Sequence, residues 1–203
     1  DDDQGRHVFR YNEPGNISSL DPAYARNQAN IWAVSQLYTP LVELDTLLNV
    51  KPLLAHSWQI SDCGRSYTFF LRTDVFFHDN ACFPGGEGRA VRASDMVYSL
   101  GRLVDPALNS PGAWVMNPVD RYPDQRLKIE ALSDTVLQIH LREAFPPFLS
   151  LLAMAYCSAV PYEAIQVYGP EFRKQAVGSG PFRFAWWKEG VKLVLLKNEH
   201  YFE

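Results

Sequence analysis

The sequence predicts a mixed α/β fold of the α+β kind, in which antiparallel hairpins are separated by helices. Three pairs of apolar or aromatic-rich segments are each joined by a short polar turn, as in hairpins: residues 58–71, 126–141 and 182–197. Segments with apolar side chains at helical spacing lie before and between these pairs. The chain contains no internal repeat. Strands that mix with helices in this order predict an α+β or mixed α/β domain.

The first part of the chain predicts a strand, a loop and a helix. His7 to Tyr11 alternates polar and apolar side chains, and the polar run Asn12 to Asn16 interrupts this alternation. From Arg26 to Tyr38, apolar side chains recur at nearly helical spacing. Pro40 ends this helix, and an extended stretch follows it over Leu41 to Leu44.

The segment that follows predicts the first hairpin. Two aromatic-rich strands, Trp58 to Ile60 and Tyr67 to Leu71, flank the turn-forming run Ser61 to Gly64. A short strand is expected at Val75 to Phe77. Ser94 is then expected to cap a helix, because a hydroxyl before an apolar periodic run accepts a hydrogen bond from the first turn.

The last third predicts two further hairpins and two short helices. Alternating polarity pairs residues 126–131 with 137–141, and 182–187 with 191–197. Proline, which is tolerated in a first helical turn, opens the helices at residues 145–148 and 161–165.

Composition excludes several classes of protein. The 203 residues carry 19 basic and 23 acidic side chains, for a net charge of -4, and so offer no basic surface for nucleic acid or anionic lipid. The longest apolar run, Phe148 to Val160, is shorter than the roughly 20 residues that span a bilayer and is expected in the core.

The chain has three cysteines. Cys63 and Cys82 border the same predicted group of strands, and an exported protein could join them in a disulfide. The sequence leaves that pairing open, since the separation of their Cα atoms decides it. Cys157, in an apolar run, is expected to be a buried small side chain.

A succession of short motifs extends over almost the whole chain. In order, they are Ser19-Leu20-Asp21-Pro22, Leu37 to Val42, Ala55-His56-Ser57-Trp58, Tyr67 to Arg72, Val75 to Asn80, Arg92 to Ser99, Val177 to Phe182, and Asn198 to Phe202. This succession resembles the family 5 extracellular solute-binding proteins, which include the oligopeptide, dipeptide and nickel receptors of ABC importers. The order of the motifs, more than any one of them, carries the resemblance.

The resemblance implies a periplasmic-binding-protein-like fold of type II, with only the first lobe present. It places a core domain in residues 1–44 and 172–203, with a smaller α+β domain inserted at residues 45–171. The family is normally more than twice as long, so the second lobe is expected outside these residues. A loop insertion at residues 82–89 and Asn80, where the family has Gly, depart from the pattern.

The implied function is that of an exported receptor, periplasmic or at the cell surface, rather than an enzyme. It would bind a peptide or other small solute between two lobes and deliver it to an ABC transporter permease. Lipid anchoring to the membrane would come from outside these residues, and no cofactor is expected. Two alternatives are a surface signalling or scaffold receptor of the same fold and, less favoured, a hydrolase that uses Ser179.

The resemblance also implies ligand-binding residues. In the peptide-binding members, the backbone shortly after the Leu-Asp-Pro motif pairs with the ligand as an added strand, and the matching positions are Arg26, Asn27 and Gln28. The alternative is that these residues only begin the helix, with Asn27 or Gln28 as its cap.

A second candidate is Trp114, in the loop Ser110 to Met116. This loop resembles one that borders the family's cleft, where an aromatic can follow Ser-Pro directly, whereas here Gly112 takes that place. The alternative is that Trp114 packs beneath its own loop.

The sequence gives no convincing catalytic or metal site. His78 and Asp79 match no strong metal-ligand spacing and are expected to be structural. Ser179 lies in Gly178-Ser179-Gly180, which lacks the G-x-S-x-G elbow of hydrolases. A turn whose glycines permit close chain crossing is the favoured interpretation.

Overall fold

Four antiparallel strands form the largest sheet of the chain, of which the structure, a computed structural model, describes residues 8–202. They are β3 (Ala55–Ile60), β4 (Ser66–Leu71), β5 (Ile129–Ala131) and β6 (Val136–His140). The order across the sheet is β3-β4-β6-β5. The first two predicted hairpins are therefore formed, and they join each other because β4 pairs with β6.

One face of this sheet is buried beneath a helix. Tyr67, Phe69 and Leu71 alternate along β4, and each is at most 2% exposed. The helix α2 (Ala93–Leu103) lies against β5 and β6 and adds Met96 and Leu100 to the same core. Every second side chain of β4 and one face of α2 therefore pack together in one apolar layer.

The remaining elements are short. β1 (Val42–Leu44) and β2 (Val50–Pro52) form a two-stranded antiparallel sheet. The other helices are α1 (Gln28–Leu37), α3 (Phe148–Leu151) and α4 (Tyr162–Tyr168). Short 3-10 turns are η1 (Pro22–Tyr24), η2 (Pro84–Gly86), η3 (Ala113–Met116), η4 (Ala155–Cys157) and η5 (Gly169–Lys174).

Late in the sequence, the chain crosses closely over the end of α1. A Cβ on Gly178 would lie 2.0 Å from the Leu37 carbonyl oxygen, and a Cβ on Gly180 would lie 2.6 Å from the Leu37 carbonyl carbon. The Gly180 N–H donates to the Leu37 carbonyl at 3.0 Å, and the Thr39 hydroxyl donates to the Ser179 carbonyl at 3.0 Å. The glycines therefore permit a close crossing, as expected.

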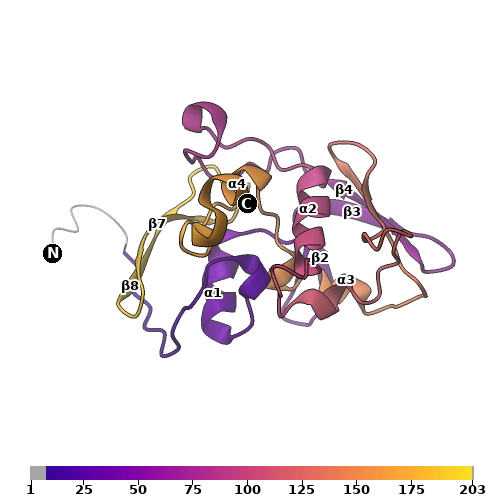
Figure 1. Cartoon of the computed structure of the whole chain (residues 1–203), viewed down its shortest axis with the longest axis horizontal. Helices are drawn as coiled ribbons and strands as arrows, with labels where there is room; N and C mark the ends of the chain where they lie inside the picture. The colour runs from indigo at the N-terminus through magenta and orange to yellow at the C-terminus, as the bar shows by residue number, and fades with distance from the viewer. Residues whose placement is uncertain (1–7, 203) are drawn as a thin grey trace.

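The third predicted hairpin follows this crossing. β7 (Phe182–Lys188) and β8 (Lys192–Lys197) pair only with each other among the described residues. Figure 1 shows this hairpin at one end of the molecule and the β3–β4 hairpin at the other, with α1 and α2 between them.

Two predicted strands are wrong. Over residues 8–11 the backbone forms no strand among the described residues, and His7 lies outside them. Tyr11 instead stacks on Trp32 of α1, with ring centroids 4.8 Å apart. The stretch Val75 to Phe77 makes only a single bridge, between Phe76 and Ala90, because Gly88 and its neighbours approach it as an irregular loop. Alternating polarity marks extended backbone, and a strand additionally needs a partner.

The start of α2 also differs from the prediction. Arg92 rather than Ser94 precedes the first helical residue, and Ser94 lies inside the first turn. The Asp95 carboxylate accepts the Arg92 N–H at 2.8 Å, which satisfies this end of the helix from within. The helix α1, predicted from Arg26, begins two residues later at Gln28.

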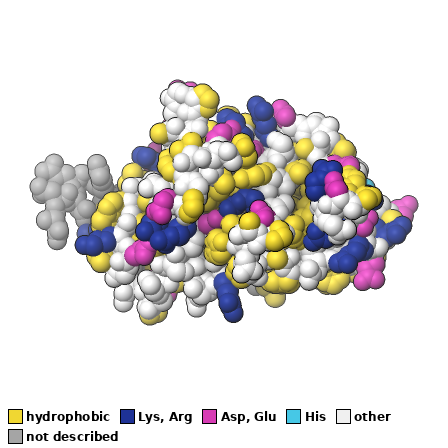
Figure 2. Space-filling model, in the orientation of Figure 1, with side chains coloured by type: hydrophobic (Ala, Val, Ile, Leu, Met, Phe, Trp, Pro, Cys, Tyr) yellow, Lys and Arg dark blue, Asp and Glu magenta, His cyan; other side chains and the backbone are white. Residues whose placement is uncertain are grey.

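All three cysteines are free thiols, so Cys63 and Cys82 are not joined. Cys63 lies exposed in the turn between β3 and β4, whereas Cys82 is buried in the irregular loop after Phe77. Within residues 8–202 no helix has the length and apolar character needed to cross a membrane. On the face shown in Figure 2, basic and acidic side chains are interspersed, without a broad basic patch.

Candidate functional site

The predicted ligand-binding segment forms the link between η1 and α1. Arg26, Asn27 and Gln28 all have exposed side chains. Asn27 is extended, with φ −99° and ψ 162°, and its side-chain oxygen accepts the Asn30 N–H at 2.8 Å. Asn27 is therefore the N-cap of α1, as the structural alternative held. This role occupies its side chain and leaves its backbone N–H available.

Two backbone groups in this link have no hydrogen-bond partner among the described residues. The Arg26 N–H donates to the Tyr24 carbonyl at 2.7 Å, and the Asn27 carbonyl accepts the Ile31 N–H at 2.9 Å. The Arg26 carbonyl and the Asn27 N–H, by contrast, make no hydrogen bond within residues 8–202. The two groups belong to one trans peptide unit and point to opposite sides of the chain, so a strand added on one side can pair with one of them.

A buried ion pair joins the residues just before this link to α2. The Arg102 guanidinium of α2 lies 2.8 Å from the Asp21 carboxylate, and their side chains are 11% and 5% exposed. The same carboxylate accepts the Ala23 N–H at 3.0 Å and so caps η1. Because a guanidinium can engage a carboxylate through two N–H groups, the pair fixes orientation as well as distance.

The second candidate loop is joined directly to the first. The Ser110 hydroxyl donates to the Ala23 carbonyl at 2.6 Å and accepts the Gly112 N–H at 3.0 Å. The Tyr24 hydroxyl donates to the Leu108 carbonyl at 2.6 Å. The structure therefore places the segment around Arg26 beside the loop that carries Trp114, although about eighty residues separate them in the sequence.

Trp114 lies on η3 and keeps 48% of its surface exposed. This exposure favours a surface position over packing beneath its own loop. Tyr156, only 7% exposed, takes the position under the loop. A Cβ on Gly112 would lie 2.4 Å from the Tyr156 ring, so Gly112 lets the ring support the loop directly.

The electrostatics also connect Tyr156 to Arg26. Burial raises the pKa of the Tyr156 hydroxyl, and the positive charge of Arg26 opposes that rise. Arg26 itself forms no salt bridge with any carboxylate of residues 8–202. The site thus combines a cation without a carboxylate partner, an exposed indole and two unpaired backbone groups.

Sequence reasoning missed four residues that build this site: Asp21, Arg102, Ser110 and Tyr156. Asp21 lies inside the Leu-Asp-Pro motif, which was the available signal, but its partner lies 81 positions away. The Ser110 contact with Ala23 spans 87 positions. Neither contact can be inferred from the local sequence pattern.

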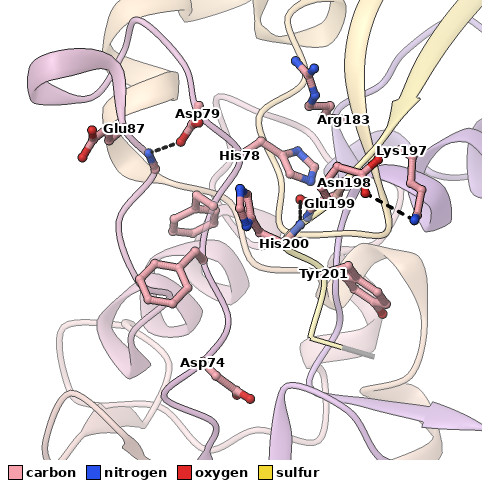
Figure 3. A pocket seen from close by; sticks show the side chains of 13 residues that line it. Asp74, His78, Asp79, Glu87, Arg183, Lys197, Asn198, Glu199, His200 and Tyr201 are labelled. Carbon is pink, nitrogen blue, oxygen red and sulfur yellow. Dashed lines mark hydrogen bonds and ion pairs between the residues drawn. The ribbon is translucent and has the colours of Figure 1, made fainter.

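A groove lies elsewhere in the molecule. This groove, of about 740 Å³, lies between the segment 74–79 and residues 197–201, and Figure 3 shows its lining. Within it, Lys197 pairs with Glu199 at 3.4 Å, and the Asp79 carboxylate accepts the Gly88 N–H at 2.9 Å. None of the predicted site residues lines it.

The serine of the crossing does not have the environment of a nucleophile. Ser179 is 1% exposed, and its hydroxyl has no hydrogen-bond partner among the described residues. The nearby His78 uses Nε2 at 3.0 Å on the Gly180 carbonyl. A nucleophilic serine needs a base on its hydroxyl and access for substrate. His78 therefore acts here as a structural contact, and no group of three or more metal-ligating side chains occurs within residues 8–202.

A family model described as bacterial extracellular solute-binding proteins, family 5 Middle, matches residues 49–203. The chain belongs to this family. The chain is 28% identical over 208 residues to a probable deoxycholate-binding periplasmic protein of Escherichia coli. This alignment covers 97% of the chain and 37% of that protein. It is 32% identical over 180 residues to heme-binding protein A of Haemophilus influenzae, covering 83% of the chain and 32% of that protein.

Solved structures agree with the family. The periplasmic binding protein DppA of Helicobacter pylori, in complex with the peptide STSA, is 32% identical with a TM-score of 0.78, covering 92% of this chain and 38% of that one. The chain spans about a third of the length of these relatives. The predicted family 5 membership and the mixed α/β, periplasmic-binding-protein-like fold of a single lobe are confirmed. The family consists of binding proteins, and its members are extracellular.

Proposed function

We propose that these residues form one wall of the solute site of a receptor that supplies an ABC transporter permease, and that the solute is a peptide. The observation that carries the proposal is the exposed peptide unit between Arg26 and Asn27, whose carbonyl and N–H are both without a hydrogen-bond partner among the described residues. These two groups point to opposite sides of the chain, so a peptide bound on the carbonyl side can donate an N–H to Arg26. Main-chain recognition of this kind gives affinity without demanding particular side chains.

The rigid support behind these groups favours the same function. The buried pair of Asp21 with Arg102, and the hydroxyl of Ser110 on the Ala23 carbonyl, hold the link against α2 and the second loop. A preorganised backbone loses less conformational entropy when a ligand binds. Both Arg26 to Gln28 and Trp114 are proposed as solute contacts on this support.

The division of the chain into a core domain, residues 1–44 and 172–203, and an inserted domain, residues 45–171, is part of the proposal. Hydrogen bonds that join the two ends support it. The Leu20 N–H donates to the Arg173 carbonyl at 2.8 Å, and the Gly180 N–H donates to the Leu37 carbonyl at 3.0 Å. A second lobe, outside these residues, would close over the solute and distinguish the loaded from the empty receptor.

Isothermal titration calorimetry tests the backbone contact. The complete receptor is titrated with a tripeptide and with the same tripeptide N-methylated at its central residue, which removes one N–H donor. We expect the methylated peptide to bind roughly tenfold more weakly, because one hydrogen bond and its buried partner are lost. Equal affinity for the two peptides would refute added-strand recognition.

The same measurement tests the need for two lobes. Residues 1–203 alone are expected to bind the unmodified tripeptide far more weakly than the complete receptor, because the contacts from the second lobe are missing. Equal affinities of the two proteins would show that one lobe is sufficient.

A further inference from the structure

One charged side chain in the proposed site is not used by the fold. Arg26 is exposed, and within residues 8–202 it makes no salt bridge and no side-chain hydrogen bond. Two other arginines of the chain are paired. Arg102 is paired with Asp21, and Arg89 is paired with both Asp95 and Glu163. Arg26 therefore differs from these in leaving its guanidinium donors unpaired where the solute is proposed to lie.

The surroundings of Arg26 favour an occupant with two kinds of surface. Two hydrogen bonds, from Ser110 to the Ala23 carbonyl and from Tyr24 to the Leu108 carbonyl, join the segment that carries Arg26 to the loop of Trp114. The Trp114 indole, 48% exposed, offers an apolar face on the same loop. A guanidinium binds carboxylate through paired N–H groups, and an exposed indole binds apolar surface.

We propose that this site prefers acidic peptides. Arg26 receives a carboxylate of the peptide, and Trp114 contacts the apolar surface beside it. This inference rests on the proposed function, since it assigns a solute class to the same site. Its physical basis is electrostatic complementarity: the fold supplies a cation here and no carboxylate to neutralise it, so an acidic ligand is attracted and a basic ligand is repelled.

The experiment measures the binding of two tripeptides, Ala-Glu-Ala and Ala-Lys-Ala, to the complete receptor by isothermal titration calorimetry. The wild type is expected to bind Ala-Glu-Ala roughly tenfold more tightly than Ala-Lys-Ala, which is the scale of one charge-assisted contact. Arg26→Glu should reverse this preference, and Arg26→Ala should abolish it. Trp114→Ala should weaken both peptides by a similar factor, because the indole contact does not depend on charge.

Arg65→Glu is the matched control. Arg65 is also exposed, lies in the turn between β3 and β4, and undergoes the same change of charge, so it reports any general effect of net charge. It should leave the ratio of the two affinities unchanged. Far-ultraviolet circular dichroism of each variant confirms the fold, which substitutions at exposed side chains should leave intact.

The outcomes separate the inference from the function on which it rests. If both peptides bind with equal affinity, and Arg26→Glu changes neither, then the charge preference is wrong while peptide binding stands. If Arg65→Glu shifts the ratio as much as Arg26→Glu, the preference belongs to the overall field and the assignment to Arg26 is overturned. If neither peptide binds the wild type, the proposed peptide function fails, and the acidic preference fails with it.

Discussion

The two hairpins at opposite ends of the molecule carry similar sequence patterns but have different surroundings. In the first, β4 pairs on both sides, with β3 and β6, and Phe69 is fully buried. In the second, β7 and β8 pair only with each other among the described residues, and Trp186 is 49% exposed. An isolated two-stranded hairpin is at best marginally stable, so tertiary packing and not local sequence distinguishes the two.

The difference teaches where the stability of this chain resides. Apolar burial is concentrated in the four-stranded sheet, α2 and the elements that join them to α1. The second hairpin is held to the rest of the chain by the segment Val177 to Gly180, which is buried where it crosses the end of α1. The strands of this hairpin carry lysines at their ends, at Lys188, Lys192 and Lys197. Charged side chains on an unpaired strand edge disfavour pairing with strands of other chains.

The largest expected effect is the contrast between two aromatic truncations. Phe69→Ala should lower the free energy of unfolding by about 4 kcal/mol, because it removes a fully buried ring and leaves a cavity. Trp186→Ala should lower it by only about 2 kcal/mol, because half of the indole is already in water. Urea denaturation followed by circular dichroism measures both. Similar losses in the two variants would mean that the second hairpin is held as firmly as the first.

A second contrast uses two glycines with different space around them. Gly178→Ala should destabilise the chain by about 3 kcal/mol, since its new Cβ would lie 2.0 Å from the Leu37 carbonyl oxygen and force the crossing apart. Gly101→Ala, within α2, should instead stabilise it by up to about 1 kcal/mol, because a Cβ there has no atom within 4 Å and alanine favours the helix. The same denaturation experiment measures both signs. A Gly178 variant as stable as the wild type would contradict the close crossing.

The sequence predicted the elements that depend on residues close together in the chain. Turn residues and alternation located all three hairpins, because those signals act over a few residues. They also predicted a strand at Val75 to Phe77, where the backbone makes only a single bridge. The predicted helix cap, Ser94, was wrong. The Asp95 carboxylate accepts the Arg92 N–H, and the residue types alone do not show which of Ser94 and Asp95 stabilises the helix start.

The candidate site could be predicted only in part. The motif order placed Arg26 to Gln28 and Trp114, but the contacts that bring them together depend on side chains far apart in the sequence. The pair of Asp21 with Arg102 required the packing of α2 against η1. Such long-range pairs follow from tertiary structure and leave no periodic signal.

The smallest expected effect concerns His78, which ties the crossing to the loop after the first hairpin. Its Nε2 lies 3.0 Å from the Gly180 carbonyl, and its buried Nδ1 has no partner among the described residues. Burial lowers the pKa of this imidazole. The hydrogen bond to Gly180 and the charge of Asp79 oppose that fall, while the charge of Arg183 adds to it. The neutral ring is therefore favoured in the folded chain.

A lowered folded pKa fixes the sign of the pH dependence. The unfolded chain takes up the proton as the pH falls through about 6.5, before the folded chain does, so the stabilisation present above that pH is lost on acidification. The slope due to His78 is at most about 1.4 kcal/mol per pH unit. His78→Gln, whose amide can still donate to the Gly180 carbonyl, should remove this part of the slope between about pH 5 and 7. Denaturation of both proteins over that range gives the answer, and identical slopes would show that the crossing does not sense the charge of His78.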